Sequence, residues 1–267
     1  MISDGIKIPP EIFCFFVVKY KILMYNGKKR IRRIYMFFWI FFVLGLAVSA
    51  VFIIRRGVDS DPYALSLKAV SSLMFVFTSA AACWYNSGNY KYSLMITCGL
   101  AACMLGDVWL DLKSIFKQNE KYFLNGGFIF FMVGHFIFAS TVTIANSIKG
   151  VDFLICLTAP VVVGIGVQFT PKLIGVDYTG YRVISTLYGV FLSMSFSVGF
   201  MACVRTGFAQ AQVAAFSAAV LITLSDAVLC PIYFGDKKRS RPFVVANHII
   251  YYIGQFLFAL SAYLFKA

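Results

Sequence analysis

Two aspartates of this chain lie inside long apolar segments, Asp107 within residues 92–112 and Asp226 within residues 208–230. A carboxyl group at the centre of a membrane-spanning helix costs roughly 2.5–3.5 kcal/mol, so a residue in this position is a candidate functional group. Two carboxyl groups in one water-poor pocket suit acid–base chemistry, because one can stay protonated as a proton donor while the other stays ionised and activates water. We therefore predict Asp107 and Asp226 to be the catalytic residues.

Other polar residues follow helical spacing. Lys68 begins a polar stripe within residues 64–84, and His248, Tyr252 and Gln255 form a second stripe. If the helices alternate in direction, these positions and the two aspartates lie near one membrane face. The sequence therefore predicts a polar pocket that opens toward that face. Polar residues predicted to lie near that face include Lys68, His135, Tyr188, Tyr251, Tyr252 and Gln255.

The elements that must position these residues are apolar helices. Of the 267 residues, 60% are hydrophobic and only 13% are charged, whereas a soluble domain carries about 25% charged residues. The apolar runs are about 20 residues long, which is enough to cross a bilayer as a helix. We therefore predict an all-α membrane protein, a bundle of eight transmembrane helices. The predicted spans are about 36–54, 64–84, 92–112, 123–146, 151–170, 181–204, 208–230 and 243–265.

The chain is predicted to have two parts, a basic leader (residues 1–35) and a single transmembrane domain (residues 36–267). In the leader, the apolar residues 12–24 are interrupted by Lys19 and Lys21, which predicts a helix at the membrane interface and not a span. The net charge is +13, and the basic residues lie between the apolar segments. This distribution favours anionic lipid headgroups over nucleic acid as partners. The charges of the leader and of the loops favour opposite orientations, so the topology stays open.

Other classes of function fit the sequence less well. A serine hydrolase is disfavoured because the sequence has no Gly-x-Ser-x-Gly motif, and a zinc site with three histidines is excluded because His135 and His248 are the only two. We predict no metal and no cofactor. A different lipid ester or amide hydrolase, with a metal at His135, Asp107 and Asp226, remains an alternative. A lipid transporter or receptor is another, although a transporter would more often show an internal repeat.

Small residues on the faces of the spans permit close helix packing, either within one chain or between two, which allows for a homo-oligomer. These residues are Gly99, Ala102, Gly106, Ala209, Ala214 and Ala218.

Five short motifs follow one another along the chain. They are LGDVWL at 105–110, GHFIF at 134–138, LYGVFLSM at 187–194, LSDAVL at 224–229 and YYIGQ at 251–255. In this order, within a frame of eight spans, the motifs resemble the YhhN family of multi-pass membrane lysoplasmalogenases. Lys68 also matches a lysine of the family pattern. Trp109, Asp111 and the leader depart from that pattern.

The resemblance implies a specific reaction. It is hydrolysis of the vinyl ether bond of a lysoplasmalogen, a lysophospholipid such as lysoplasmenylethanolamine or lysoplasmenylcholine. The products would be a fatty aldehyde and glycerophosphoethanolamine or glycerophosphocholine. The apolar spans predict an integral membrane location, in the endoplasmic reticulum or plasma membrane of a eukaryote or in the inner membrane of a bacterium. Asp107 and Asp226 match the two aspartates of the family pattern.

The resemblance implies that the substrate-binding residues are Lys68, His135, Tyr188, Tyr251, Tyr252 and Gln255. Lys68 would contact the headgroup phosphate as a point charge. Tyr188, Tyr251 and Gln255 would orient the glycerol and the water.

Overall fold

The computed structural model describes residues 36–57, 60–86, 90–167, 169, 175–235 and 240–265. The leader predicted for residues 1–35, with its interfacial helix, lies outside these ranges.

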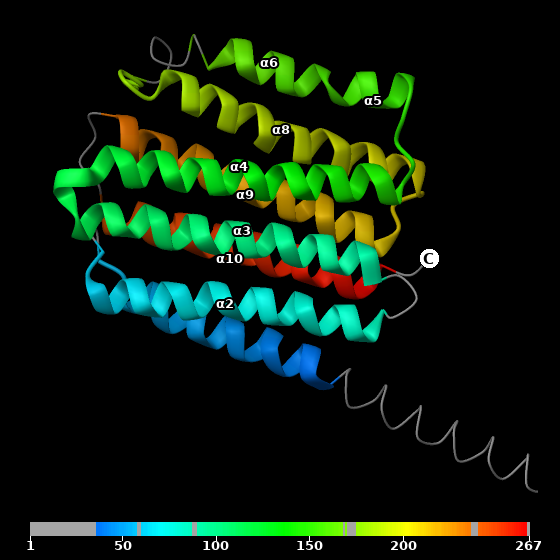
Figure 1. The fold of residues 1–267 in the computed structure, drawn as a ribbon, viewed down its shortest axis with the longest axis horizontal. Coiled ribbons are helices and arrows are strands. Elements are labelled where there is room, and N and C mark those ends of the chain that lie inside the picture. The colour runs from blue at the N-terminus through cyan, green and yellow to red at the C-terminus, as the bar shows by residue number, and fades with distance from the viewer. Residues whose placement is uncertain are drawn as a thin grey trace, which may run out of the picture.

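Helices make up most of the described chain (Figure 1). The first described helix is Met36–Arg55. The later elements are α2 (Pro62–Tyr85), α3 (Tyr90–Ile115), the 3₁₀ helix η1 (Lys117–Asn119), α4 (Glu120–Ala145), α5 (Val151–Cys156), α6 (Thr158–Gly166), α8 (Arg182–Arg205), α9 (Gln210–Phe234) and α10 (Arg241–Leu264).

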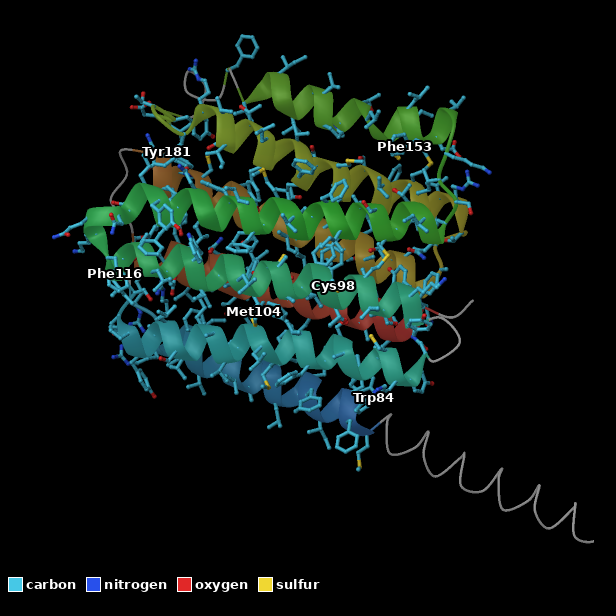
Figure 2. The ribbon with its side chains drawn as sticks, viewed as in Figure 1. Trp84, Cys98, Met104, Phe116, Phe153 and Tyr181 are labelled. Atoms are coloured by element: carbon cyan, nitrogen blue, oxygen red, sulfur yellow. The ribbon has the colours of Figure 1, made fainter. Side chains whose placement is uncertain are left out.

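Seven of the described helices are long and apolar enough to cross a membrane, namely Met36–Arg55, α2, α3, α4, α8, α9 and α10. The prediction of a multi-pass, all-α membrane protein is therefore confirmed. The outer surface of the bundle is apolar, as expected for contact with lipid. Trp84, for example, is 72% exposed and Val183 is 74% exposed, and Trp84 lies at the margin of the bundle in Figure 2.

The fifth predicted span, residues 151–170, takes a different form. Here α5 and α6 together cover only Val151–Gly166, and a turn at Leu157 separates them. Pro160 has no N–H to bond the carbonyl of Cys156, so the helical hydrogen-bond pattern is interrupted at this point. The predicted span is therefore present as two short helices.

Consecutive long helices pack antiparallel, as in α2–α3–α4 and α8–α9–α10, whereas the contacting pairs α4 and α8, and α2 and α10, run parallel. α3 contacts α2 and α4, while α10 contacts α9, α2 and α3; α8 joins α4 to α9 and carries α5 and α6 on its other side (Figure 1). The starts of α2, α4, α8 and α10 and the ends of α3 and α9 therefore lie at one end of the bundle, on the left in Figure 1. We call this the η1 end, because η1 connects α3 to α4 there.

Two glycines permit close helix contacts. A Cβ atom at Gly134 of α4 would lie 2.6 Å from the Cys103 Sγ and 3.0 Å from the Gly99 carbonyl oxygen of α3. A Cβ atom at Gly254 of α10 would lie 3.2 Å from the carbonyl oxygen of Ala218 in α9. Gly99 and Ala218 were among the small residues predicted to allow close packing, and they take part in contacts within this chain.

The start of α2 is fixed by its N-cap. The Oδ1 of Asp61 accepts a 2.7 Å hydrogen bond from the Ala64 N–H, and Pro62 occupies the first helical position, where no N–H donor is needed. The hydrogen bond from Ala64 holds the pKa of the Asp61 carboxyl below its ordinary value. This start sets the register of α2 that buries Lys68, which is only 5% exposed.

Candidate functional site

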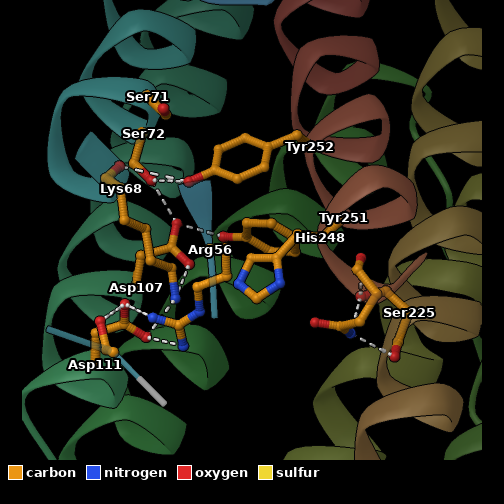
Figure 3. A network of polar contacts seen from close by, with 12 residues as sticks. Arg56, Lys68, Ser71, Ser72, Asp107, Asp111, Ser225, His248, Tyr251 and Tyr252 are labelled. Atoms are coloured by element: carbon orange, nitrogen blue, oxygen red, sulfur yellow. Dashed lines mark hydrogen bonds and ion pairs between the residues drawn. The ribbon is translucent and has the colours of Figure 1, made fainter. Parts of the chain in front are cut away.

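Lys68 lies between two carboxylates of α3. Its Nζ is 3.3 Å from the Oδ1 of Asp107 and 3.3 Å from the Oδ1 of Asp111 (Figure 3). The two aspartates are four residues apart, so they share one face of the helix. Both are 2% exposed. Because a buried charge without a partner is costly, each of these three groups depends on the others for its compensation.

Asp107 receives further hydrogen bonds from the neighbouring helices. Its Oδ2 accepts a 2.7 Å bond from the Ser72 hydroxyl of α2 and a 2.8 Å bond from the Tyr251 hydroxyl of α10. Together with Lys68, these donors stabilise the ionised form of the carboxyl group and fix its orientation.

Asp111 is held by residues that the sequence analysis did not include in the site. Arg56 forms two hydrogen bonds with the carboxylate, Nη1 to Oδ2 at 3.0 Å and Nη2 to Oδ1 at 3.2 Å, and the Ser60 hydroxyl donates to Oδ2 at 2.8 Å. The four-residue spacing from Asp107 is the signal that could have placed Asp111 in the site. Arg56, at the end of an apolar span, gave no comparable signal, because arginines are common at membrane interfaces.

Asp226 of α9 has a different environment. The Tyr188 hydroxyl of α8 donates a hydrogen bond to its Oδ2. No lysine or arginine of the described chain pairs with Asp226, in contrast to Asp107. The side chain of Asp226 is partly exposed, toward a cavity that Asp107 also lines.

This cavity has a volume of about 280 Å³ and reaches inward from the η1 end of the bundle. Five of the eight predicted site residues line it, namely Asp107, Asp226, Lys68, Tyr188 and Tyr251. Arg56, Asp111 and His248 add further polar groups to the lining. Much of the remaining wall is apolar and includes Leu110, Phe128, Phe131, Val163, Val167 and Leu192.

The other three predicted residues do not line the cavity. Tyr252 follows Tyr251, so it projects about 100° further around α10, and its hydroxyl lies 3.2 Å from the Ser72 Oγ, behind Asp107. His135 and Gln255 are fully buried, at 0% exposed. The prediction that these three residues contact substrate is not supported by their placement, because spacing along a helix does not give the direction in which the helix faces.

A metal at Asp107, Asp226 and His135 was one alternative from the sequence. In the described part of the chain, no group of three His, Cys, Asp or Glu residues is arranged to hold a metal ion. His135 also lies outside the cavity lining. The described residues therefore do not provide this ligand set.

The fold and the site define a class, a multi-pass helical membrane protein with an ion-paired carboxylate cluster beside an internal cavity. The sequence model of the YhhN family matches residues 63–262. The chain belongs to the YhhN family, as its motifs predicted. Comparison with curated proteins gives no significant match, and neither does comparison with solved structures.

Proposed function

We propose that this protein is a lysoplasmalogenase, which hydrolyses the vinyl ether bond of a lysoplasmalogen to a fatty aldehyde and a glycerophosphoethanolamine or glycerophosphocholine. Family membership and the motifs shared with that family support the proposal. The observation that carries it is the unequal environment of two aspartates on one cavity: Asp107 is ion-paired with Lys68, whereas Asp226 pairs with no cation among the described residues. Hydrolysis of an enol ether needs one acid and one base, and this pair supplies both.

Asp226 is the proton donor in this proposal. A carboxyl group in an apolar environment without a cation favours its neutral form. In the described structure, Tyr188 is its one side-chain hydrogen-bond partner, and that bond goes to Oδ2. The other oxygen, Oδ1, can therefore carry the proton that is transferred.

Asp107 is the base and the stabilising anion. Lys68 compensates its charge, and the hydroxyls of Ser72 and Tyr251 orient the carboxylate. A fixed carboxylate beside the cavity can stabilise the positive charge that develops during the reaction, because no reorganisation is needed.

The reaction then proceeds through an oxocarbenium ion. Asp226 donates a proton to the vinyl carbon farther from the ether oxygen, and the carbon bonded to that oxygen becomes cationic. Water adds to this carbon and gives up a proton to Asp107, which forms a hemiacetal. The hemiacetal then gives its hydroxyl proton to the Asp226 carboxylate as its bond to the glycerol oxygen breaks. That oxygen takes the proton held by Asp107, so the aldehyde and the glycerophospho alcohol are released and both aspartates return to their starting states.

The headgroup phosphate belongs at the η1 end in this proposal, beside Arg56 and His248. Both residues line the cavity, and the Arg56 Nε has no hydrogen-bond partner among the described residues. Asp111, which Arg56 binds, lies one turn from Asp107, about 6 Å along α3. The three-carbon glycerol unit spans a comparable separation between vinyl ether and phosphate. Lys68, the predicted phosphate ligand, is instead held between two carboxylates.

The test is aldehyde release from lysoplasmenylethanolamine by purified protein and by the variants Asp107→Asn and Asp226→Asn. Each variant is expected to lose at least about 100-fold in kcat, because each lacks one partner of the acid–base pair. Asp152→Asn is a matched control, since Asp152 pairs with Arg205 away from the cavity. Wild-type turnover in both site variants would exclude the mechanism. Release of fatty acid from a 1-acyl lysophospholipid, without aldehyde release, would favour an ester hydrolase.

A further inference from the structure

Several buried polar atoms have no hydrogen-bond partner among the described residues, and three of them belong to two side chains in the core of the bundle. These three are the Oε1 and Nε2 of Gln255 and the Nε2 of His135. Both side chains are 0% exposed. Nearly all buried polar groups in native proteins are hydrogen-bonded, to protein or to ordered water, because an unpaired one is costly. These atoms therefore call for a partner other than a described side chain.

Gln255 lies directly beneath one half of the acid–base pair. It is four residues beyond Tyr251 on α10, so it lies on the same face, about 6 Å further from the η1 end. Cys103 occupies the equivalent position on α3, four residues before Asp107. The Gln255 side chain is within hydrogen-bonding reach of the Cys103 thiol, but a thiol is a weak hydrogen-bonding group and leaves most of the amide's capacity unused.

His135 lies beneath Asp226, the other member of the acid–base pair. Its ring centroid is 6.1 Å from that of Tyr188, whose hydroxyl binds Asp226. The Nδ1 of His135 lies 3.3 Å from the Ser195 Oγ, which leaves Nε2 as the atom without a partner. His135 is also four residues beyond Phe131, a cavity-lining residue of α4. Gln255 and His135 thus each lie one helical turn below the cavity lining. Gln255 is on the side of Asp107, and His135 is on the side of Asp226.

We propose that Gln255 and His135 bind internal water beneath the two aspartates, and that this water is the nucleophile of the hydrolysis. The side chains suit this ligand, because water can accept from the Gln255 Nε2 and donate to the Gln255 Oε1 or to an unprotonated His135 Nε2. The role of the water rests on the proposed function. The reaction needs water at the oxocarbenium ion, but an alkenyl chain that fills the apolar cavity excludes bulk water from that cation. A water molecule bound beneath the cavity would supply it.

The internal water enters one step. Its oxygen forms a bond with the oxocarbenium carbon, and one of its protons passes to the Asp107 carboxylate, which gives the hemiacetal. One water molecule is consumed for each vinyl ether cleaved. Gln255 and His135 position the water and take no proton, so they are positioning residues.

The first experiment does not depend on activity. Gln255→Met removes the amide at nearly constant side-chain volume. If the amide binds water, the variant loses those hydrogen bonds and its unfolding temperature falls below that of the wild type. If the amide is unpaired in the native protein, its removal relieves a cost and the unfolding temperature rises. Thr78→Val is the matched control, because the Thr78 hydroxyl bonds the Met74 carbonyl within its own helix at 2.8 Å.

The second experiment measures how the cation partitions between water and added methanol, which traps it as a methyl acetal. In Gln255→Met we expect kcat to fall about 10-fold or more with KM nearly unchanged, and the acetal share of the product to rise. An unchanged acetal share or a raised unfolding temperature overturns the proposal. If the wild type releases no aldehyde, the proposed function fails, and the direction of the temperature shift alone decides whether water is bound.

Discussion

The Nζ of Lys68 lies 3.3 Å from the Oδ1 of Asp107, whereas no lysine or arginine of the described chain pairs with Asp226. Both aspartates line one cavity, so the ion pair is the feature that makes them chemically unequal. This inequality assigns the base to Asp107 and the acid to Asp226 in the proposed reaction, a distinction that the sequence left open.

Removal of the Lys68 charge is expected to abolish this distinction. In Lys68→Met, two buried carboxylates lose a shared cation, so Asp107 becomes easier to protonate and serves poorly as a base. We expect kcat for aldehyde release to fall about 100-fold or more. Lys149→Met, at an exposed loop position, is the control and is expected to keep wild-type kinetics. Full activity in Lys68→Met would contradict the assigned role of the ion pair.

The pair formed by Arg56 and Asp111 should couple strongly. Asp111→Asn leaves Arg56 buried without its carboxylate partner, and breaking such a pair costs about 3–5 kcal/mol. The double variant Arg56→Met, Asp111→Asn removes both charges and is expected to be more stable than Asp111→Asn alone. Denaturation of the two single variants and the double variant gives the coupling energy. Additive effects would show that the pair does not act as a unit.

The two tyrosine hydroxyls should affect rate more than stability. Tyr251→Phe removes a hydrogen bond to the ionised Asp107, worth about 1.5–3 kcal/mol, so we expect kcat to fall about 10- to 100-fold. Tyr188→Phe removes a hydrogen bond to the neutral Asp226, worth about 0.5–1.5 kcal/mol, so we expect kcat to fall about 2- to 10-fold. Tyr92→Phe is the comparison, because the Tyr92 hydroxyl bonds Ser261 at 3.4 Å outside the cavity lining. Steady-state rates of the three variants test the prediction, and equal losses in all three would refute it.

Close contact between α3 and α4 should depend on Gly134. In Gly134→Ala the new methyl would lie 3.0 Å from the Gly99 carbonyl oxygen, and such overpacking typically costs about 1–3 kcal/mol. Gly166→Ala is the control, since a Cβ there meets nothing within 4 Å. The unfolding temperature should fall for Gly134→Ala and hold for Gly166→Ala. Equal unfolding temperatures for the two variants would mean that α3 and α4 can move apart without loss of stability.

Long apolar segments made much of the fold predictable from the sequence. The span predicted for residues 64–84 became Pro62–Tyr85, and that for 181–204 became Arg182–Arg205. The form of residues 151–170 was harder to predict, because hydropathy gives the length of an apolar run but not the hydrogen bonds that a proline removes. Pro160 lies within this run, and its consequence, two short helices, is seen only in the structure.

The site was predictable where a charged group lies in an apolar span, as at Asp107 and Asp226. Lys68, Tyr188 and Tyr251, which the sequence placed near the same membrane face as the two aspartates, line the cavity with them. Spacing alone could not give the rotation of α4 and α10 about their axes, so His135 and Gln255 were assigned to the substrate.

Arg56 could not have been found in the same way. Its partner, Asp111, lies 55 residues away in sequence, and only the packing of helices brings the two together.

The most direct test of the proposed reaction is incubation of the purified wild-type protein in D₂O with a lysoplasmalogen and, separately, with its saturated ether analogue. Proton transfer to carbon predicts aldehyde from the vinyl ether alone, with one deuterium on the carbon next to the carbonyl. A folded protein that releases no aldehyde, or aldehyde without deuterium at that carbon, would contradict the proposed mechanism.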